Sequence, residues 1–311
     1  MPGDGRRLDE SALGLLVDGR RLRRLLRAIR FDVAGFAVDP GRDPDLLAIV
    51  EEPFESSADA RNRLERLEAA LLHRSDHRSV FLTVYTEMTA QAITAVAEEA
   101  FSDAAWMERY LVRFAEYYRR AFYDFERGAI EDVPDPWVVA FGTAVRGESL
   151  VLQDALLGIN AHINYDLALT LSDVGLDPDR PAKYADHNRV NDLLARLVSV
   201  QRELLSERYA PGLSRVGVGL GGLDERGSAA ALRTAREAAW RTAVVRSDTR
   251  WESVRTYTEW LLRRTATGSA SLLVHPDLSP STMELLHDVE GDRVDLVRYA
   301  REYHERANRT A

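Results

Sequence analysis

The stretch LLGINAHINYDLALTL, which runs from Leu156 to Leu171, is apolar around nearly its whole circumference when it is set on a helical wheel. A surface helix has one apolar face, whereas a helix that is apolar all round must be covered on most sides by other elements. This stretch therefore predicts a buried central helix, and the rest of the chain is expected to supply the helices that surround it.

The flanking sequence repeats a helical period of hydrophobicity and hardly shows the two-residue alternation that is typical of strands. Strand candidates are limited to Phe31–Val38 and Val216–Val218, which is too little for a sheet. We therefore predict an all-α fold, a multi-helix bundle with a central buried polar helix. The predicted helices lie at 9–30, 57–74, 86–101, 103–127, 136–145, 148–173, 184–209, 228–247, 249–267 and 280–308.

Shifts in composition suggest four parts of the chain. Residues 1–45 are predicted to form an N-terminal helical extension, and residues 46–212 a core helical domain that carries the NAHINYD motif. Residues 213–227 are rich in glycine and predict a connection. Residues 228–311 are predicted to be C-terminal helices that pack on the core.

The composition excludes several classes of function. The chain of 311 residues has 41 basic and 50 acidic side chains, a net charge of −9, which argues against a nucleic acid or an anionic membrane as a partner. It has no cysteine, so disulfides, thiol catalysis and cysteine-ligated metals are excluded. Lys183 is the only lysine, which excludes most lysine chemistry unless Lys183 itself takes part.

The chain also shows no transmembrane or export signal. No stretch reaches the roughly 18 uninterrupted apolar residues of a membrane span, and residues 1–10 lack the apolar core of a signal peptide. We therefore expect no membrane span and a cytoplasmic location. The basic, amphipathic segment Arg20–Arg30 is interpreted either as an ordinary surface helix or as a contact for a membrane surface or a partner.

The polar residues of the central stretch form two groups on the helical wheel. His162 and Asp166 are four residues apart and lie one above the other, whereas Asn160 and Asn164 cluster with Gln153 on the opposite side. Buried polar groups need partners, so each of these side chains must be paired. A His–Asp pair one turn apart is typical of two metal ligands, or of an imidazole that a carboxylate orients. On the same face as this pair, the small residues Ala155 and Gly158 would let another helix or a ligand approach closely.

Aromatic side chains dominate one side of the predicted helix 103–127. Tyr110 and Tyr117 fall with several other rings in an arc of about 120° on the helical wheel. The stripe either lines a pocket for an apolar substrate, with these tyrosines as binding groups, or simply forms core. Tyrosines buried in such a core would each need a hydrogen-bond partner.

The next predicted helix begins with DHNRVND, residues Asp186–Asp192. Asp186 is interpreted either as the N-cap of this helix or as a ligand or acid/base group. Antiparallel neighbouring helices would bring Asp186 and Asn191 within reach of His162 and Asp166. His187, on a leucine-rich face, is interpreted as a core histidine. The alternative for the whole set is a buried hydrogen-bond network that fixes helix register without catalysis.

The two motifs together resemble an uncharacterised bacterial and archaeal family of helical proteins, a domain of unknown function with a Gly-x-Asn-Ala-His-Ile-Asn-x-Asp-Leu core. The resemblance is specific in the central stretch and extends more loosely from about Phe81 to Pro211. A second family pattern, Asp-x-x-x-Val-Asn, corresponds to Asp186, Val190 and Asn191, and His187 lies outside it. The family carries no established reaction. The matching positions of the core motif are Gly158, Asn160, Ala161, His162, Ile163, Asn164, Asp166 and Leu167.

Three hypotheses for function follow from these residues. In the first, the chain is an enzyme that hydrolyses or oxidises a small, moderately apolar molecule, with a divalent zinc, iron or manganese ion as the expected cofactor. His162 is then a metal ligand or general base, and Asp166 and Asp186 are further ligands or carboxylates that orient it. Asn160, Asn164 and Asn191 would then position the substrate or hold the metal ligands in place. In the second, His162 and Asp166 act as a metal-free acid/base pair of a lyase, isomerase or cyclase. In the third, the protein is a non-catalytic scaffold whose polar network specifies packing.

Overall fold

A computed structural model describes residue 26 and residues 31–216, 225–276, 279–290 and 295–310. The described residues contain no strand, which confirms the all-α prediction. The α-helices are α3 (Pro44–Val50), α4 (Ser57–His73), α5 (Arg78–Ala97), α6 (Ala104–Glu126), α7 (Asp135–Arg146), α8 (Val151–Ala161), α9 (Leu167–Val174), α10 (Arg180–Val216), α11 (Glu225–Asp248), α12 (Glu252–Val274), α13 (Pro280–Glu290) and α14 (Leu296–Thr310).

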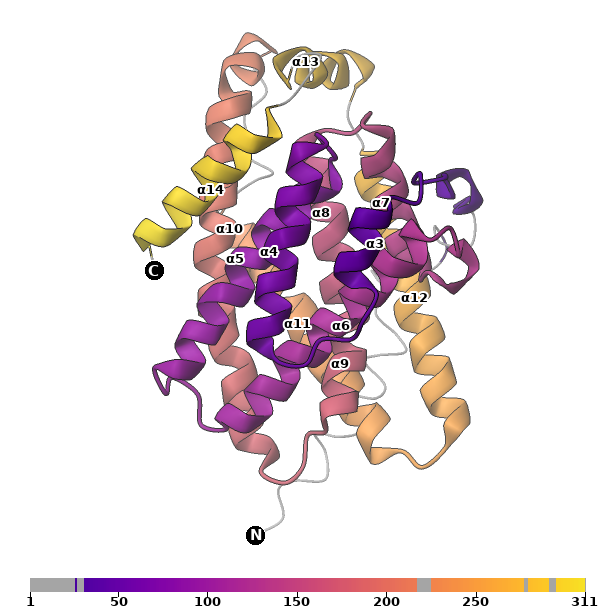
Figure 1. Cartoon of the computed structure of the whole chain (residues 1–311), viewed down its shortest axis with the longest axis vertical. Helices are drawn as coiled ribbons and strands as arrows, with labels where there is room; N and C mark the ends of the chain where they lie inside the picture. Colours follow the sequence, from indigo (N-terminus) through magenta and orange to yellow (C-terminus); the bar gives the residue numbers. More distant parts are fainter. Residues whose placement is uncertain (1–25, 27–30, 217–224, 277–278, 291–294, 311) are drawn as a thin grey trace.

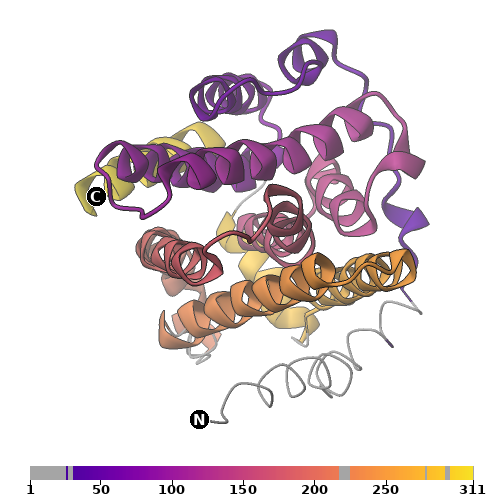
Figure 2. The same ribbon diagram turned by 90° about the horizontal axis from the view of Figure 1, so that it is seen from below.

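The central stretch lies between two groups of helices. The segment from α8 to α9 contacts α5, α6 and α7 on one side and α11 and α12 on the other. Figure 2 shows this arrangement end-on, with the long helix α6 on one side of the central segment and α11 and α12 on the opposite side. The expected bundle around a central buried polar helix is thus confirmed.

Several predicted boundaries were wrong. Helix α5 begins at Arg78 rather than near residue 86. Its first three turns are buried on every side and show no apolar periodicity, so the hydrophobic pattern did not predict them. The predicted helix 280–308 is two helices, α13 and α14. The strand candidate Phe31–Val38 contains a 3₁₀ turn, Ala34–Phe36, and short helix α3 was not predicted.

Two further predictions fall largely outside the described residues. The predicted helix 9–30 does so except for Leu26, which is helical and half exposed. Of the predicted Gly-rich connection 213–227, the described residues at its two ends belong to α10, which continues to Val216, and to α11, which begins at Glu225. Residues 217–224 lie outside the described residues.

Helix α5 is long and apolar enough to span a membrane by length and composition alone, and it is the one such helix among the described residues. Most of its apolar stretch is buried inside the protein. Figure 1 shows α5 near the middle of the bundle, between α4 and α10. A central core helix has these same properties.

The C-terminal helix α14 is joined to the bundle by a histidine between two glutamates. Nε2 of His304 lies 2.9 Å from a carboxylate oxygen of Glu68 in α4, and its Nδ1 lies 2.8 Å from one of Glu87 in α5. Burial alone would lower the pKa of His304, but the two carboxylates outweigh it and raise this pKa to about 10. His304 is therefore a cation that ties α14 to α4 and α5.

This contact predicts a stability that falls at alkaline pH. Because the folded-state pKa of His304 is raised, its contribution is fully present below the ordinary value of 6.5 and is lost as the pH rises through about 10. We expect the difference in unfolding free energy between wild type and His304→Gln to shrink across that interval in denaturant titrations. The exposed His73→Gln serves as control and should show no such trend. A difference that is independent of pH would contradict the charged state of His304.

Candidate functional site

The NAHINYD motif forms a π-helical turn in the middle of the central segment. The turn, η3 (His162–Asp166), separates α8 from α9, and the backbone N–H of Leu167 donates to the carbonyl of His162, five residues earlier. Turns of this kind are rare in proteins, and many of those that occur lie at functional sites. The irregular backbone therefore coincides with the residues that the sequence singles out.

His162 and Asp166 form a hydrogen-bonded pair inside this turn, as predicted from their spacing. Nδ1 of His162 lies 2.9 Å from Oδ2 of Asp166. The indole N–H of Trp137, from α7, donates to the same Oδ2 atom at 2.9 Å. Both side chains of the pair are buried, with 2% and 1% of their surface exposed.

Two atoms of the pair have no partner among the described residues, namely Nε2 of His162 and Oδ1 of Asp166. Burial holds the pKa of His162 well below its ordinary value, so the imidazole is neutral. Burial likewise raises the pKa of Asp166, against the opposing effect of the Trp137 hydrogen bond. Oδ2 of Asp166 already accepts a hydrogen bond from Trp137, and its position favours a second one from Nδ1–H of His162. The proton of the neutral imidazole then lies on Nδ1, which leaves a lone pair on Nε2.

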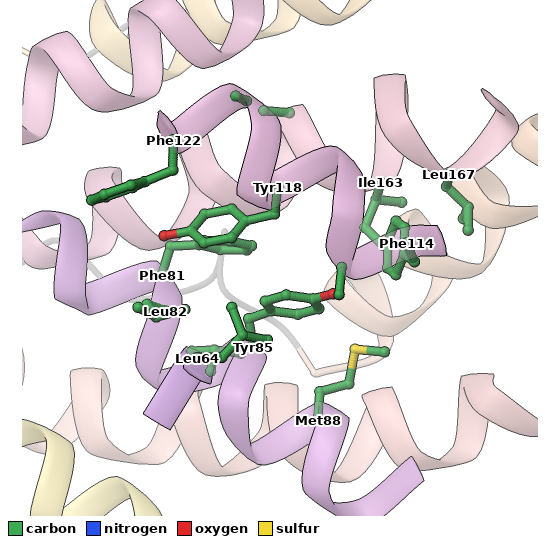
Figure 3. Close-up of a cluster of buried hydrophobic side chains, with 14 of the residues drawn as sticks. Leu64, Phe81, Leu82, Tyr85, Met88, Phe114, Tyr118, Phe122, Ile163 and Leu167 are labelled. Atoms are coloured by element: carbon green, nitrogen blue, oxygen red, sulfur yellow. The ribbon is translucent and has the colours of Figure 1, made fainter. Parts of the chain in front are cut away.

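Aromatic rings enclose the imidazole of His162. Phe114 stacks on it with ring centroids 3.6 Å apart, and Tyr85 meets it edge-on at 4.5 Å. Figure 3 shows Tyr85 of α5 and Phe114 of α6 in one cluster with residues of the central segment. The aromatic stripe of α6 is therefore core that packs on the pair. The remaining rings are those of Phe81, Trp137 and Tyr118, at 5.8, 5.9 and 6.4 Å.

Asn160 and Asn164 face the other way, toward α12, as the helical wheel predicts. Nδ2 of Asn160 donates to the carbonyl of Ala266 at 2.9 Å, and Nδ2 of Asn164 donates to Oδ1 of Asn160 at 2.9 Å. Gln153, of the same group, donates to the carbonyl of Leu273 at 2.8 Å. These side chains join the central segment to α12, so the structure separates them from the His162–Asp166 pair.

Asp186 does not join the pair, contrary to the prediction. Its two carboxylate oxygens accept from the backbone N–H groups of Ser102 and Asp103, at 2.9 and 2.8 Å, immediately before α6. Arg189 donates to the same carboxylate at 2.7 Å. Asp186 is also not the N-cap of its own helix, because α10 already begins at Arg180. It anchors the start of α6 instead.

The three-ligand metal site that we expected from His162, Asp166 and Asp186 is therefore not assembled. Within the part of the chain that the structure describes, no group of three His, Asp or Glu side chains is placed to hold a metal ion. The reason is the position of Asp186, whose carboxylate is already used by two backbone N–H groups and an arginine.

A second buried polar cluster lies where α6, α10 and α11 meet. Arg236 of α11 donates through Nε to Oδ1 of Asn191 at 2.7 Å, and through a terminal nitrogen to the carbonyl of His187 at 2.6 Å and to its Nδ1 at 3.2 Å. The hydroxyl of Tyr110 lies 3.4 Å from the same Nδ1. Two predicted binding residues, Tyr110 and Asn191, thus belong to this cluster.

Tyr117, the other predicted binding tyrosine, belongs to neither cluster. Its hydroxyl donates to Asp173 at 2.8 Å, beside Arg113, on a partly exposed side of α6. Its side chain packs against the small buried cluster of Tyr165, Leu169 and Ala266. Tyr110 and Tyr117 therefore lie in different surroundings, although the helical wheel places them in one arc.

Comparison with known sequences matches residues 58–276 to a family of unknown function, DUF5995. The chain belongs to this family. The resemblance to an uncharacterised helical family is thereby confirmed. The matched region contains the π-helical turn of this DUF5995 member, the aromatic rings around His162, and Arg236. Searches among curated proteins and among solved structures found no match.

Two polar residues of this DUF5995 chain, Arg236 and His187, were not predicted as site residues. Arg236 follows Leu232 and precedes Trp240 by four residues, so its place on an apolar helix face is a signal that could have revealed it. His187 was interpreted as a core histidine and is indeed buried, but its contacts with Arg236 place it at the centre of the second cluster.

Proposed function

We propose that the chain is an enzyme that acts on a small, moderately apolar molecule by general acid–base catalysis, of the lyase, isomerase or cyclase type. His162 accepts a proton from the substrate through Nε2. Asp166 orients the imidazole and stabilises the positive charge that develops on it, and Trp137 holds Asp166 in place. The apolar character of the substrate is inferred from the aromatic rings around the pair.

The observation that carries this proposal is the buried Nε2 atom of His162, which has no hydrogen-bond partner in the described part of the chain. A buried polar atom without a partner costs stability, and an apolar side chain at this position would avoid that cost. The neutral imidazole that burial enforces has the protonation state of a general base. Its location in a π-helical turn adds independent support.

The ligand geometry favours this mechanism over the metal-dependent hydrolysis or oxidation that we considered from the sequence. A zinc, iron or manganese ion at His162 would need carboxylate or imidazole ligands beyond Asp166. Asp186, the expected third ligand, holds the start of α6. The proposal therefore assigns both proton transfer and orientation to the pair itself.

A non-catalytic scaffold is the second candidate, and the stacking of Phe114 favours it. With ring centroids 3.6 Å apart, Phe114 occupies one face of the imidazole, so a ligand must approach Nε2 in the plane of the ring. Under this candidate, the His162–Asp166 pair only specifies how the π-helical turn packs.

The test is proton exchange with solvent. Wild-type protein and His162→Asn are incubated with a bacterial metabolite extract in D₂O, and the extract is analysed by mass spectrometry. The asparagine amide can still donate to Asp166 but lacks the outer nitrogen. We expect wild type to convert a metabolite or to label it with deuterium, and His162→Asn to lose this activity by about 100-fold or more.

Two controls complete this experiment. His73→Asn, at an exposed position of α4, should behave as wild type, and addition of a chelator should leave the activity unchanged. If wild type and His162→Asn leave the extract equally unaltered while His162→Asn unfolds more readily, the scaffold is the correct interpretation. Activity that disappears with the chelator would instead favour the metal-dependent enzyme.

A further inference from the structure

Arg236 carries a buried positive charge that no described carboxylate balances. Only 1% of the surface of this residue is exposed. Its partners are the side-chain oxygen of Asn191, the carbonyl and Nδ1 of His187, and the hydroxyl of Tyr110, all of which are neutral groups. Within the described residues, Arg236 makes no ion pair. A buried charge without an opposite charge is strongly unfavourable, so a counter-anion is required.

The acidic side chains near this cluster are already used elsewhere. Asp186 holds the backbone before α6. Glu237, the neighbour of Arg236 in α11, accepts from the hydroxyl of Tyr184 and from Arg241, each at 2.7 Å. Asp192 is exposed and faces Arg233. The counter-anion is therefore not supplied by these residues.

The cluster leaves two hydrogen-bond donors without acceptors. One terminal nitrogen of Arg236, Nη1, is buried and has no partner among the described residues. Arg236 donates to Nδ1 of His187, so the proton of this neutral imidazole lies on Nε2. Nε2 of His187 is likewise buried without a described partner. Two donors and one positive charge thus remain unmatched on adjoining side chains.

We propose that Arg236 and His187 bind the carboxylate of a small monoanionic ligand with an apolar body, at the junction of α10 and α11. A carboxylate has two acceptor oxygens and one negative charge, which match the free donors and the charge of Arg236. A phosphate dianion would bring more charge than the cluster balances. The rings of Trp240 and Tyr110 lie 5.3 and 6.2 Å from the His187 ring, and they supply apolar surface for the ligand body.

This inference does not rest on the proposed function of His162, because no polar contact joins the two clusters among the residues that the structure describes. Phe114 and Tyr110, one turn apart on α6, separate them. Both donors are closed off from solvent, so binding requires local separation of α10 and α11. Titrations must therefore be given time to reach equilibrium.

The test compares carboxylates with their neutral amides. Benzoate and octanoate are added at equal ionic strength, alongside benzamide and octanamide, and thermal unfolding and binding are measured. We expect the carboxylates to raise the Tm of wild type and to bind at least about tenfold more tightly than the amides, since a hydrogen bond between charged groups is lost with the amide. A wild type that responds equally to acid and amide overturns the proposal.

Variants locate the effect. Arg236→Met should abolish the preference for carboxylates and, without ligand, should melt no lower than wild type, because an unbalanced buried charge is removed. Arg233→Met, at an exposed position one turn earlier in α11, should keep the preference. If Arg236→Met does not fold, His187→Phe provides the same test and should weaken carboxylate binding about tenfold. A preference retained in Arg236→Met or His187→Phe overturns the proposal.

Discussion

Replacement of Gly158 by alanine is expected to lower the free energy of unfolding by about 3 kcal/mol. A Cβ atom at Gly158 would lie 2.3 Å from Cγ and 2.5 Å from Cβ of Phe81, closer than carbon atoms can approach. Because Cβ of Phe81 is attached directly to the backbone, rotation of the ring does not relieve the clash, and α5 and α8 must separate. Denaturant titration should show a lower midpoint at an unchanged slope.

Gly35→Ala is the matched control for this result. A Cβ atom at Gly35 would meet only a carboxylate oxygen of Asp32, at an ordinary 3.8 Å. The expected change is within about 0.5 kcal/mol. Wild-type stability of Gly158→Ala would show that α5 and α8 do not approach as closely as the structure indicates. Phe81 also borders His162, so Gly158→Ala should impair any activity of the pair as well.

Replacement of Glu126 by alanine is expected to cost about 3–5 kcal/mol of unfolding free energy, because it breaks a buried ion pair. Arg78 donates to Oε2 of Glu126 at 2.5 Å, and both side chains are almost completely buried. The other oxygen of Glu126 accepts from the backbone N–H of Asp43 at 2.8 Å, at the start of α3. The variant therefore leaves part of the Arg78 guanidinium and one N–H group without a partner.

An exposed pair and a double variant test this explanation. Glu65→Ala removes the surface ion pair with Arg61, in which both side chains are over 40% exposed, and should change the stability by less than about 1 kcal/mol. Arg78→Met combined with Glu126→Leu should recover part of the loss seen in Glu126→Ala, since neither member of the Arg78–Glu126 pair then remains as a buried charge. Recovery is incomplete because Asp76, which also accepts from Arg78, loses its partner. Equal effects of Glu65→Ala and Glu126→Ala in denaturant titrations would contradict this account.

The central features of the fold could be predicted because they depend on local spacing. Residues four apart on a helix are neighbours whatever surrounds them, so His162 and Asp166 were expected to meet, and they do. The all-round apolar character of Leu156–Leu171 predicted its burial in the same way. The small Gly158 marked a close approach, which Phe81 makes.

Periodicity was less informative where helices are buried on all sides or where the backbone departs from α-helical geometry. The first turns of α5 carry no polar face, so no change in the hydrophobic pattern marks their start at Arg78. The residues of the π-helical turn at His162–Asp166 are equally compatible with an α-helix. The turn differs from an α-helix in its backbone hydrogen bonds, which the sequence does not reveal. Neither feature leaves a pattern that sequence spacing can detect.

The local sequence therefore determined that the chain is helical, that its central segment is buried and that His162 pairs with Asp166. These features follow from a repeat of 3.6 residues per helical turn. The partners that come from distant segments depended on how the helices pack. Packing directed Asp186 to the backbone before α6, Trp137 to Asp166, and Arg236 to His187. A hydrogen bond between residues far apart in sequence is set by helix position and rotation in the bundle, and no local pattern encodes these.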